Sequence, residues 1–319
     1  MAVTRSSRRS FDFRRGRRLV ADLKTAPCRV RRMTEFPLPG MGRAVVAAPA
    51  PGAGPGYWAG ASNAALDTDG TFVVAYRVRN GHDGIDQTVV ARSPDGEVLT
   101  TVATLDQSRF GAQWMERPAL VRTEQGRWRL YVCCGTPASK HWWIDVLEAD
   151  DPAGFQTADA RPAFPGDDRT AVKDPLVRLV DGRWHAWICC HPLDVPGAED
   201  RMSSAYATSH DGLDWEWHGT VLAGRPGQWD ARGARLTSVL PDGRAAYDGR
   251  ATAEENWFER TGLAESTGQG ARFTPIGDSP VADVRYLDVL PLPAGGFRIW
   301  YEARLPDERH ELRTELIQP

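Results

Sequence analysis

The sequence predicts an all-β chain folded as a five-bladed β-propeller, with four-stranded antiparallel blades around a polar central channel. The first indication is a repeat of strand, glycine turn and strand that occurs five times. The second is the composition, because 31 Gly and 23 Pro against 5 Met favour short strands joined by tight turns. The third is that no apolar pattern of helical period extends over about ten residues or more.

Residues 1–32 differ from the rest of the chain in composition. They contain eleven Lys or Arg against two Asp, and the only apolar stretch, 19–21, stops at Asp22. A secretory signal needs a longer apolar segment. We therefore expect a disordered basic leader, or a start codon assigned too early with the true start at Met33; a basic arm for nucleic acid or acidic lipid is the other interpretation. Residues 33–319 are expected to form a single propeller domain.

The repeat is clearest in two segments, 116–134 and 173–190, which match almost residue for residue. Each reads as a hairpin with alternating apolar positions around a glycine turn. Weaker copies occupy 63–76, 235–247 and 288–301. The turn glycines, spaced 53 to 61 residues apart, are Gly70, Gly126, Gly182, Gly243 and Gly296.

The last copy is one strand short, because the chain ends soon after the apolar stretch 312–317. The stretch 43–48 could supply the missing outer strand, which would join the two ends and remove an exposed sheet edge. Two similar segments, 93–96 and 209–215, read as the turn before an outer strand.

Charge and cysteine usage limit the partners. The net charge of −3 gives no field that would attract nucleic acid or a membrane surface, and no run approaches the roughly 18 apolar residues of a membrane span. An odd count of five Cys without a signal peptide argues against disulfides. Adjacent cysteines on a strand face opposite ways, so we expect buried thiols, no metal site and no cofactor, in a cytoplasmic protein whose oligomeric state the sequence does not address.

Aligning the five repeats places one polar residue at the same point of each first strand, where propellers line their channel. Charged residues are seldom buried unless they are paired. One interpretation is a plug in which the charges neutralise each other; the other is a ring that converges on a ligand. The ring residues are Asn63, Arg117, Asp174, Arg235 and Asp288.

The motif Lys173-Asp174-Pro175, followed by Asp181-Gly182, is similar to a third-blade motif of the five-bladed propeller glycoside hydrolases. That superfamily includes arabinanases, xylosidases, invertases and levansucrases. The segment 203–215 also resembles its outer strands. The resemblance covers most of residues 57–304 and implies that Asp174 stabilises the developing sugar cation and tunes the acid.

Three positions depart from the pattern of that superfamily. Asn63 stands where those enzymes usually carry an Asp base, and Asn cannot take a proton. Asp230 is the carboxylate nearest to the place of their Glu acid. Asp288, after Arg285-Tyr286-Leu287, stands near the place of a channel His. The candidate catalytic residues are therefore Asp174 with Asp230 or Asp288 as acid or base, and we expect Asp174→Asn to lower kcat about 100-fold.

Further candidates for substrate binding surround the ring. Glu116 precedes Arg117, although strand alternation would point it away. Arg250 lies in the polar segment 247–260, which we expect to overhang the channel. His191 and Trp229 complete the set, with Asn63, Arg117 and Arg235. Tryptophans that could stack on sugars are Trp58, Trp114, Trp142, Trp143, Trp229 and Trp257.

We expect a glycosidase-like enzyme acting on a small-molecule or oligosaccharide substrate, with an anionic sugar among the candidates. Two alternatives stay open. Arg117 and Arg235 could hold phosphate by bidentate contacts, as a glycoside phosphorylase would require. Alternatively, Asn63 could mark a sugar- or metabolite-binding propeller that has lost its base.

Overall fold

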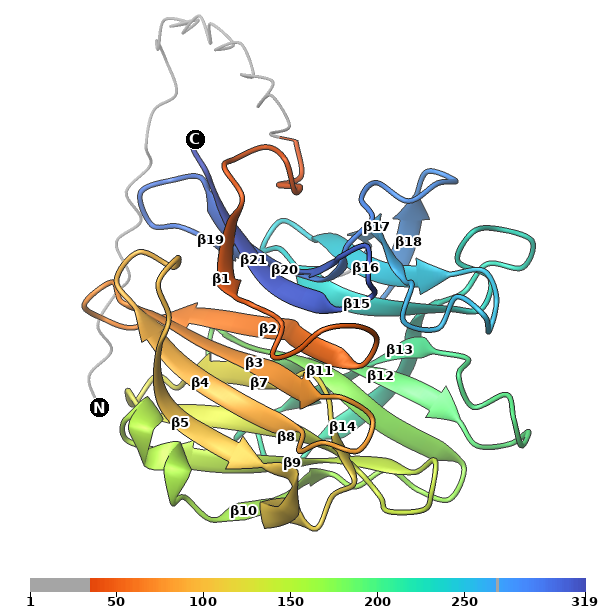
Figure 1. Cartoon of the computed structure of the whole chain (residues 1–319), viewed down its shortest axis with the longest axis horizontal. Helices are drawn as coiled ribbons and strands as arrows, with labels where there is room; N and C mark the ends of the chain where they lie inside the picture. Colours follow the sequence, from red (N-terminus) through yellow and green to blue (C-terminus); the bar gives the residue numbers. More distant parts are fainter. Residues whose placement is uncertain (1–34, 268–269) are drawn as a thin grey trace, which may run out of the picture. The chain divides into compact units, whose positions relative to one another are not determined.

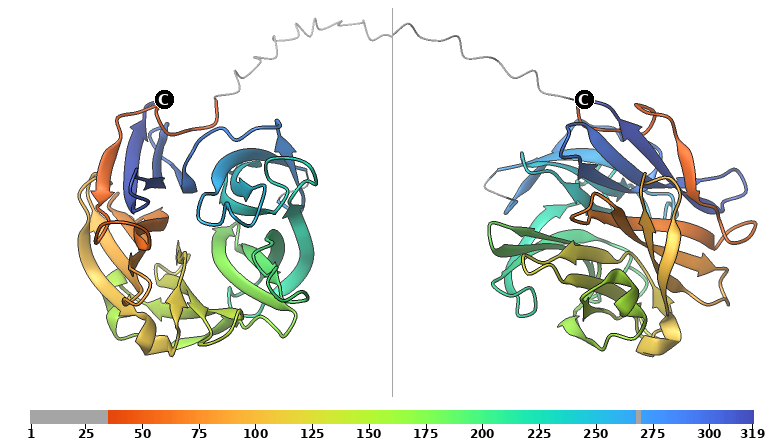
Figure 2. Two further views of the ribbon diagram at one scale, coloured as in Figure 1. Left: turned by 45° about the vertical axis from the view of Figure 1, so that its right-hand side comes forward. Right: turned by 90° about the vertical axis from the view of Figure 1, so that its left-hand side faces the viewer.

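The structure is a computed structural model that describes residues 35–267 and 270–319. The predicted leader, 1–32, lies outside the described residues. Residues 36–319 form one compact unit, in which β-sheets follow one another around a common axis (Figures 1 and 2). The only helical elements in the described ranges are two short 3₁₀ turns, η1 (Gln107–Phe110) and η2 (Pro152–Gln156).

The strands group into five antiparallel blades, as predicted. Each blade begins at the axis with its first strand and proceeds outward. Blade one is β2 (Tyr57–Leu66), β3 (Phe72–Asn80), β4 (Gln87–Ser93) and β5 (Thr100–Asp106). Blade two is β6 (Trp114–Met115) with β7 (Ala119–Arg122), then β8 (Trp128–Gly135), β9 (Trp142–Ala149) and β10 (Ala160–Phe164). Blade three is β11 (Thr170–Val180), β12 (Arg183–Pro192), β13 (Ser203–Ser209) and β14 (Glu216–Ala223). Blade four is β15 (Gly233–Val239), β16 (Arg244–Arg250), β17 (Arg260–Ser266) and β18 (Phe273–Ile276).

Blade five closes the ring with strands from both ends of the described chain. It consists of β19 (Arg285–Pro291), β20 (Phe297–Arg304) and β21 (His310–Ile317), and its outer strand is β1 (Val45–Ala48). Val45 pairs with Thr314 in antiparallel register. The prediction that 43–48 supplies the missing strand is confirmed. The edge of β21 is thereby covered, which removes a row of unpaired backbone groups.

The turns that connect the strands follow the predicted chemistry. All five turn glycines adopt a positive φ, between 73° and 89°, a conformation that glycine takes without steric cost. In the turn before β5, the backbone N–H of Gly96 donates to Ser93 Oγ at 2.8 Å. Gly212 and Ser209 repeat this bond at 2.9 Å before β14. The two predicted turns are therefore the same structure in two blades.

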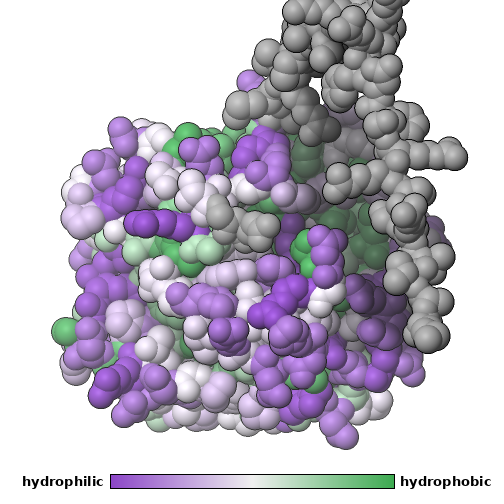
Figure 3. Space-filling view, turned by 180° about the vertical axis from the view of Figure 1, so that it is seen from behind, coloured by the Kyte–Doolittle hydropathy of each residue, from purple (hydrophilic) through white to green (hydrophobic). Residues whose placement is uncertain are grey.

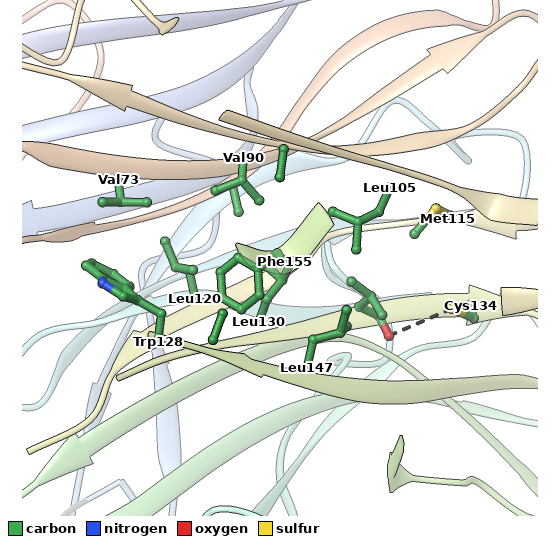
Figure 4. Close-up of a cluster of buried hydrophobic side chains, with 14 of the residues drawn as sticks. Val73, Val90, Leu105, Met115, Leu120, Trp128, Leu130, Cys134, Leu147 and Phe155 are labelled. Atoms are coloured by element: carbon green, nitrogen blue, oxygen red, sulfur yellow. Dashed lines mark hydrogen bonds between the residues drawn. The ribbon is translucent and has the colours of Figure 1, made fainter. Parts of the chain in front are cut away.

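The hydrophobic core lies between the blades and not in one central mass. The residues that the structure describes form five buried clusters, one for each pair of neighbouring blades. Figure 4 shows the cluster in which Val73 and Val90 of blade one pack on Leu130 and Trp128 of blade two. Because every blade is buried on both faces by its neighbours, the blades hold the positions of residues at the axis.

The cysteines belong to these clusters. Cys134 faces the cluster of blades one and two, whereas Cys133 faces that of blades two and three. The prediction that adjacent cysteines point to opposite faces is confirmed. Cys133, Cys134 and Cys189 are buried and Cys190 is partly buried, and these four form no disulfide in the described chain.

The outside of the molecule is mainly hydrophilic on the face shown in Figure 3, with apolar residues scattered between polar ones. Of the helices in the described residues, none has the length and apolar character to cross a membrane.

Candidate active site

Five polar residues that the sequence predicts to share the axis meet there. Asn63 Nδ2 donates to Asp288 Oδ1 at 3.2 Å, and Arg117 Nη2 lies 3.4 Å from the same oxygen. The backbone N–H of Arg117 donates to Asp174 Oδ1 at 3.2 Å, and Arg235 Nη1 donates to Asp174 Oδ2 at 2.8 Å. Residues from all five blades therefore form one connected series of contacts.

The ring neutralises itself and is closed to solvent. Its residues range from 0% exposed for Arg117 and Asp174 to 7% for Asn63. Burial raises the pKa of Asp288, although the charge of Arg117 acts against this rise. The two carboxylates are paired with two guanidinium groups, which makes their burial tolerable. These contacts correspond to the interpretation of the ring as a plug, and none of the five residues lines the cavity described below.

The ring residues are not all at equivalent positions, which corrects the sequence alignment. The first strands of blades one, three and five each contain a bulge, in which one residue takes a positive φ: Ala61 (53°), Asp174 (50°) and Tyr286 (51°). Asn63 and Asp288 lie two residues further along their strands. The alignment was shifted because a two-residue slip preserves strand alternation, so the apolar pattern cannot detect it. Blade one therefore presents Ala61 where blade three presents Asp174.

A cavity of about 630 Å³ opens beside the ring, where the first strands begin. Glu116 and Lys173 line it, and each directly precedes a ring residue on its strand. The other lining residues come mainly from the loops between the second and third strands of blades one to four. We call this cavity the funnel; it is lined by Arg79, His82, Trp114, Glu116, Lys140, Trp142, Lys173, His191, Gly197, Glu199, Asp200, Ala253, Asn256 and Trp257.

Glu116 is a carboxylate of the funnel held among cations. Arg77 Nη1 donates to Oε2 at 2.6 Å, Arg79 Nη2 donates to Oε1 at 3.2 Å, and Lys173 Nζ is 3.8 Å from Oε1. Burial alone would raise the pKa of Glu116, but the charges of Arg77, Lys173 and Arg79 hold it well below its usual range. Glu116 faces the funnel despite the expected alternation, because the strand is interrupted between Met115 and Ala119.

Lys173 and His191 form a second polar group in the funnel. Lys173 Nζ lies 4.6 Å from the centroid of the Trp142 ring. His191 pairs with Ala171 across β11 and β12, so it is the diagonal neighbour of Lys173 on the same face. His191 Nδ1 is 2.8 Å from the carbonyl oxygen of Glu199, which can only accept, so Nδ1 carries the hydrogen.

The other ring nitrogen of His191 is therefore an acceptor. Nε2 is buried and has no hydrogen-bond partner among the described residues. Burial lowers the pKa of His191 to about 3, and the charge of Lys173 adds to this effect. His191 is neutral at pH 7 and offers a lone pair to a hydrogen donor in the funnel.

Three indole rings give the funnel apolar surfaces. Trp114 and Trp142 are partly exposed, and Trp257 is 40% exposed. These rings were among the predicted stacking residues. Trp229, another candidate, instead stacks on Tyr247 at a centroid distance of 5.6 Å and does not line the funnel. Sugar rings stack on such exposed indole faces through their C–H groups, and their hydroxyls need the polar partners found nearby.

Asp230 and Arg250, two further predicted residues, are bound into ion pairs. Asp230 is 0% exposed; Arg225 Nε donates to it at 2.9 Å and the Tyr247 hydroxyl at 2.8 Å. Arg250 is 1% exposed and donates to Glu259 at 2.8 Å. Neither residue lines the funnel. Asp230, the predicted acid, is therefore held in a buried ion pair and is not part of the funnel lining.

The carboxylates of the funnel are all held in the ionised form. For Asp200, burial raises the pKa, but hydrogen bonding to Arg232 and the charge of Arg250 lower it further than burial raises it. For Glu199, backbone N–H groups, its own and that of Gly197, lower the pKa. With Glu116, these are the three carboxylates of the lining, and none is suited to donate a proton at neutral pH. The described residues contain no group of three or more His, Cys, Asp or Glu that could hold a metal ion.

The sequence did not single out the cations of the funnel. Lys173 was identified only as part of a motif, and Arg79 and Lys140 were missed. One signal was available, because the chain contains only three Lys among its 39 basic residues, and two of them, Lys140 and Lys173, line the funnel. Arg117 and Arg235, the predicted anion-binding residues, are instead paired with Asp288 and Asp174 in the ring.

No family model and no curated protein matches this sequence. Solved structures do match its fold. The β-1,2-mannobiose phosphorylase from Listeria innocua aligns with a TM-score of 0.59 at 12% identity, covering 88% of this chain and 92% of that one. A thermostable family-43 glycoside hydrolase aligns with a TM-score of 0.59 at 14% identity, covering 81% and 88%.

The α-L-arabinofuranosidase from Lactobacillus brevis gives a TM-score of 0.60 at 14% identity, covering 81% of this chain and 90% of that one. At such identities the likeness concerns the fold. The chain has the β-propeller fold of sugar-cleaving enzymes that include both hydrolases and a phosphorylase.

Proposed function

We propose that this protein is an enzyme that cleaves the glycosidic bond of a sugar bound in the funnel, with inorganic phosphate as the acceptor. The observation that carries the proposal is the composition of the funnel: three indole rings line the same cavity as one buried carboxylate, Glu116, and the cation Lys173. Aromatic faces with a few convergent polar groups are typical of ligand sites.

Glu116 is suited to stabilise the transition state. Cleavage of a glycoside develops positive charge on the sugar ring. A permanent carboxylate fixed by Arg77 and Arg79 lowers the energy of that cation without having to reorient during the reaction. Asp174 directly follows Lys173 in β11 and accepts a hydrogen bond from Arg235, so its role is to support the funnel from the ring.

The need to protonate the leaving group favours phosphate over water as the acceptor. The three carboxylates of the lining are ionised, so none of them supplies this proton. Dihydrogen phosphate carries its own: one phosphate oxygen forms the bond to the anomeric carbon, the glycosidic C–O bond breaks, and a phosphate proton passes to the departing oxygen. Lys173 and Lys140 supply charge for the anion, and His191 Nε2 can accept a hydrogen from it.

The test is a screen of glycosides with and without phosphate. We expect a sugar phosphate to form only when phosphate is present, and phosphate alone to raise Tm through binding to the folded state. Lys173→Met should abolish both effects, while Arg127→Met, a change of the same charge on the outer surface of blade two, should leave them unchanged. Release of reducing sugar without phosphate would indicate hydrolysis instead.

A binding protein without turnover is the second candidate. The observations that favour it are that blade one has Ala61 at the position equivalent to Asp174, and that the carboxylates of the funnel lining include no proton donor. Sugars that raise Tm but are not converted, with or without phosphate, would support this candidate. A chain that neither binds nor converts any sugar would contradict the proposed function altogether.

A further inference from the structure

Trp257 has a backbone conformation that a tryptophan rarely adopts. Its φ is 74°, in the left-handed region, which is strained for a bulky side chain. The side chain is nevertheless 40% exposed, so the conformation does not serve to bury it. Strain of this kind persists where the surroundings enforce it, and it is concentrated at functional sites.

The loop around Trp257 is anchored on both sides. Glu255 accepts a hydrogen bond from the backbone N–H of Ala251 at 2.6 Å and one from Arg260 at 3.0 Å. Two residues after Trp257, the buried Glu259 accepts a hydrogen bond on Oε1 from Arg250 Nη1 at 2.8 Å. These bonds hold the indole at one place before any ligand arrives.

The indole stands between two cavities. A second cavity of about 280 Å³, which we call the side pocket, shares Ala253, Asn256 and Trp257 with the funnel. Its other lining residues include Trp58 and Phe258. The ring centroids of Trp58 and Trp257 are 5.5 Å apart, and the ring planes are inclined by 59°. Two indoles therefore enclose a corner of the side pocket.

We propose that the side pocket holds a second sugar unit, and that the substrate is therefore a disaccharide or longer oligosaccharide whose units lie on both sides of Trp257. This inference rests on the proposed function of the funnel. A monosaccharide bound in the funnel would not reach the side pocket, and it would not explain why Trp257 is held in a strained conformation beside that pocket. An oligosaccharide crossing Trp257 would instead find an apolar face flanked by the polar side chain of Asn256 and the carboxylate of Glu254.

The experiment compares two substitutions of exposed tryptophans by glycine. Trp257→Gly removes the indole and relieves the positive φ, since glycine adopts it freely. Trp217→Gly is the matched control: Trp217 is 45% exposed, lies in β14 and has no positive φ. Binding is measured by titration calorimetry with mannose, β-1,2-mannobiose and a series of arabino-oligosaccharides from one to four units.

We expect the unmodified protein to bind at least one disaccharide or longer sugar at least tenfold more tightly than the corresponding monosaccharide. Trp257→Gly should remove this gain, so that the variant binds the longer sugar no more tightly than the monosaccharide. Monosaccharide affinity should fall as well, because the indole also lines the funnel. Its Tm should stay the same or rise, whereas Trp217→Gly should lower Tm, because glycine weakens a strand, and leave all affinities unchanged.

Two results would overturn the inference and can be told apart. If the protein binds a monosaccharide but gains nothing from further units, or if Trp257→Gly keeps the gain, the side pocket is not a sugar site and the proposed function still stands. If no sugar of the panel binds, the proposed function itself is wrong.

Discussion

Removing the charge of Glu116 tests whether the cations of the funnel depend on this one carboxylate. Glu116→Gln keeps the shape of the side chain, but its amide group replaces one acceptor oxygen. Either Arg77, at 2.6 Å, or Arg79, at 3.2 Å, then faces an NH₂ group instead of an oxygen. Lys173 loses its nearest carboxylate.

The structure sets the size of the expected effect. Removing one partner of a buried ion pair costs about 3–5 kcal/mol, and the Glu116 side chain is only 7% exposed. Arg77 keeps Glu302 and Arg79 keeps Asp86, so we expect the lower end of this range. At about 2 °C per kcal/mol for a chain of this length, Tm should fall by about 6 °C.

The assay is differential scanning calorimetry of the variant beside Glu148→Gln. Glu148 is a matched control, since it also binds two arginines, Arg127 and Arg129, but is 26% exposed. Exposed pairs contribute at most about 1 kcal/mol, so its Tm should change by no more than about 2 °C. Equal changes in the two variants would refute the reasoning, because burial would then have no effect on the value of the ion pair.

The same experiment has a predicted pH dependence. The folded-state pKa of Glu116 lies well below its usual range, so the carboxylate stabilises the folded state at pH values above the unfolded pKa of about 4.3. This contribution is lost as the pH falls toward the folded pKa. The difference in Tm between the protein and Glu116→Gln should therefore be complete at pH 7 and narrow below about pH 4.

Two further predictions concern the ring and the thiols. Asp174→Asn should lower Tm with little change in turnover per folded molecule, because Asp174 is fully buried against Arg235. A large fall in kcat at unchanged Tm would instead support the catalytic role that the family resemblance implied. A thiol reagent at pH 8 should react with Cys133, Cys134, Cys189 and Cys190 only after unfolding. The reason is that burial raises the pKa of each thiol, that of Cys190 to about 12. Fast labelling of any of the four in the native protein would contradict the described packing.

Local chemistry was enough to predict most of the fold. Turn glycines such as Gly126 and Gly182 and the alternation of Cys133 and Cys134 could be predicted, because each depends on neighbours in the sequence or on strand alternation. The outer strand 43–48 could be predicted because the last repeat is one strand short. Five repeats with this spacing also determine the number of blades. What a strand needs in order to form and to bury its two faces is present in its own residues.

The site was decided by tertiary structure. Asn63 and Asp288 align with Asp174 in the sequence, but the bulged residues equivalent to Asp174 are Ala61 and Tyr286, two residues earlier. A slip of two residues leaves strand alternation unchanged, so the apolar pattern does not reveal it. Whether a carboxylate is paired depends on cations from other blades, and these meet it only when the ring closes. The pairing of Asp230 with Arg225, five residues away, shows that even a close partner was not evident from the sequence. The sequence by itself thus determines that polar residues reach the axis, and the closed ring of blades determines which of them remain available to a ligand.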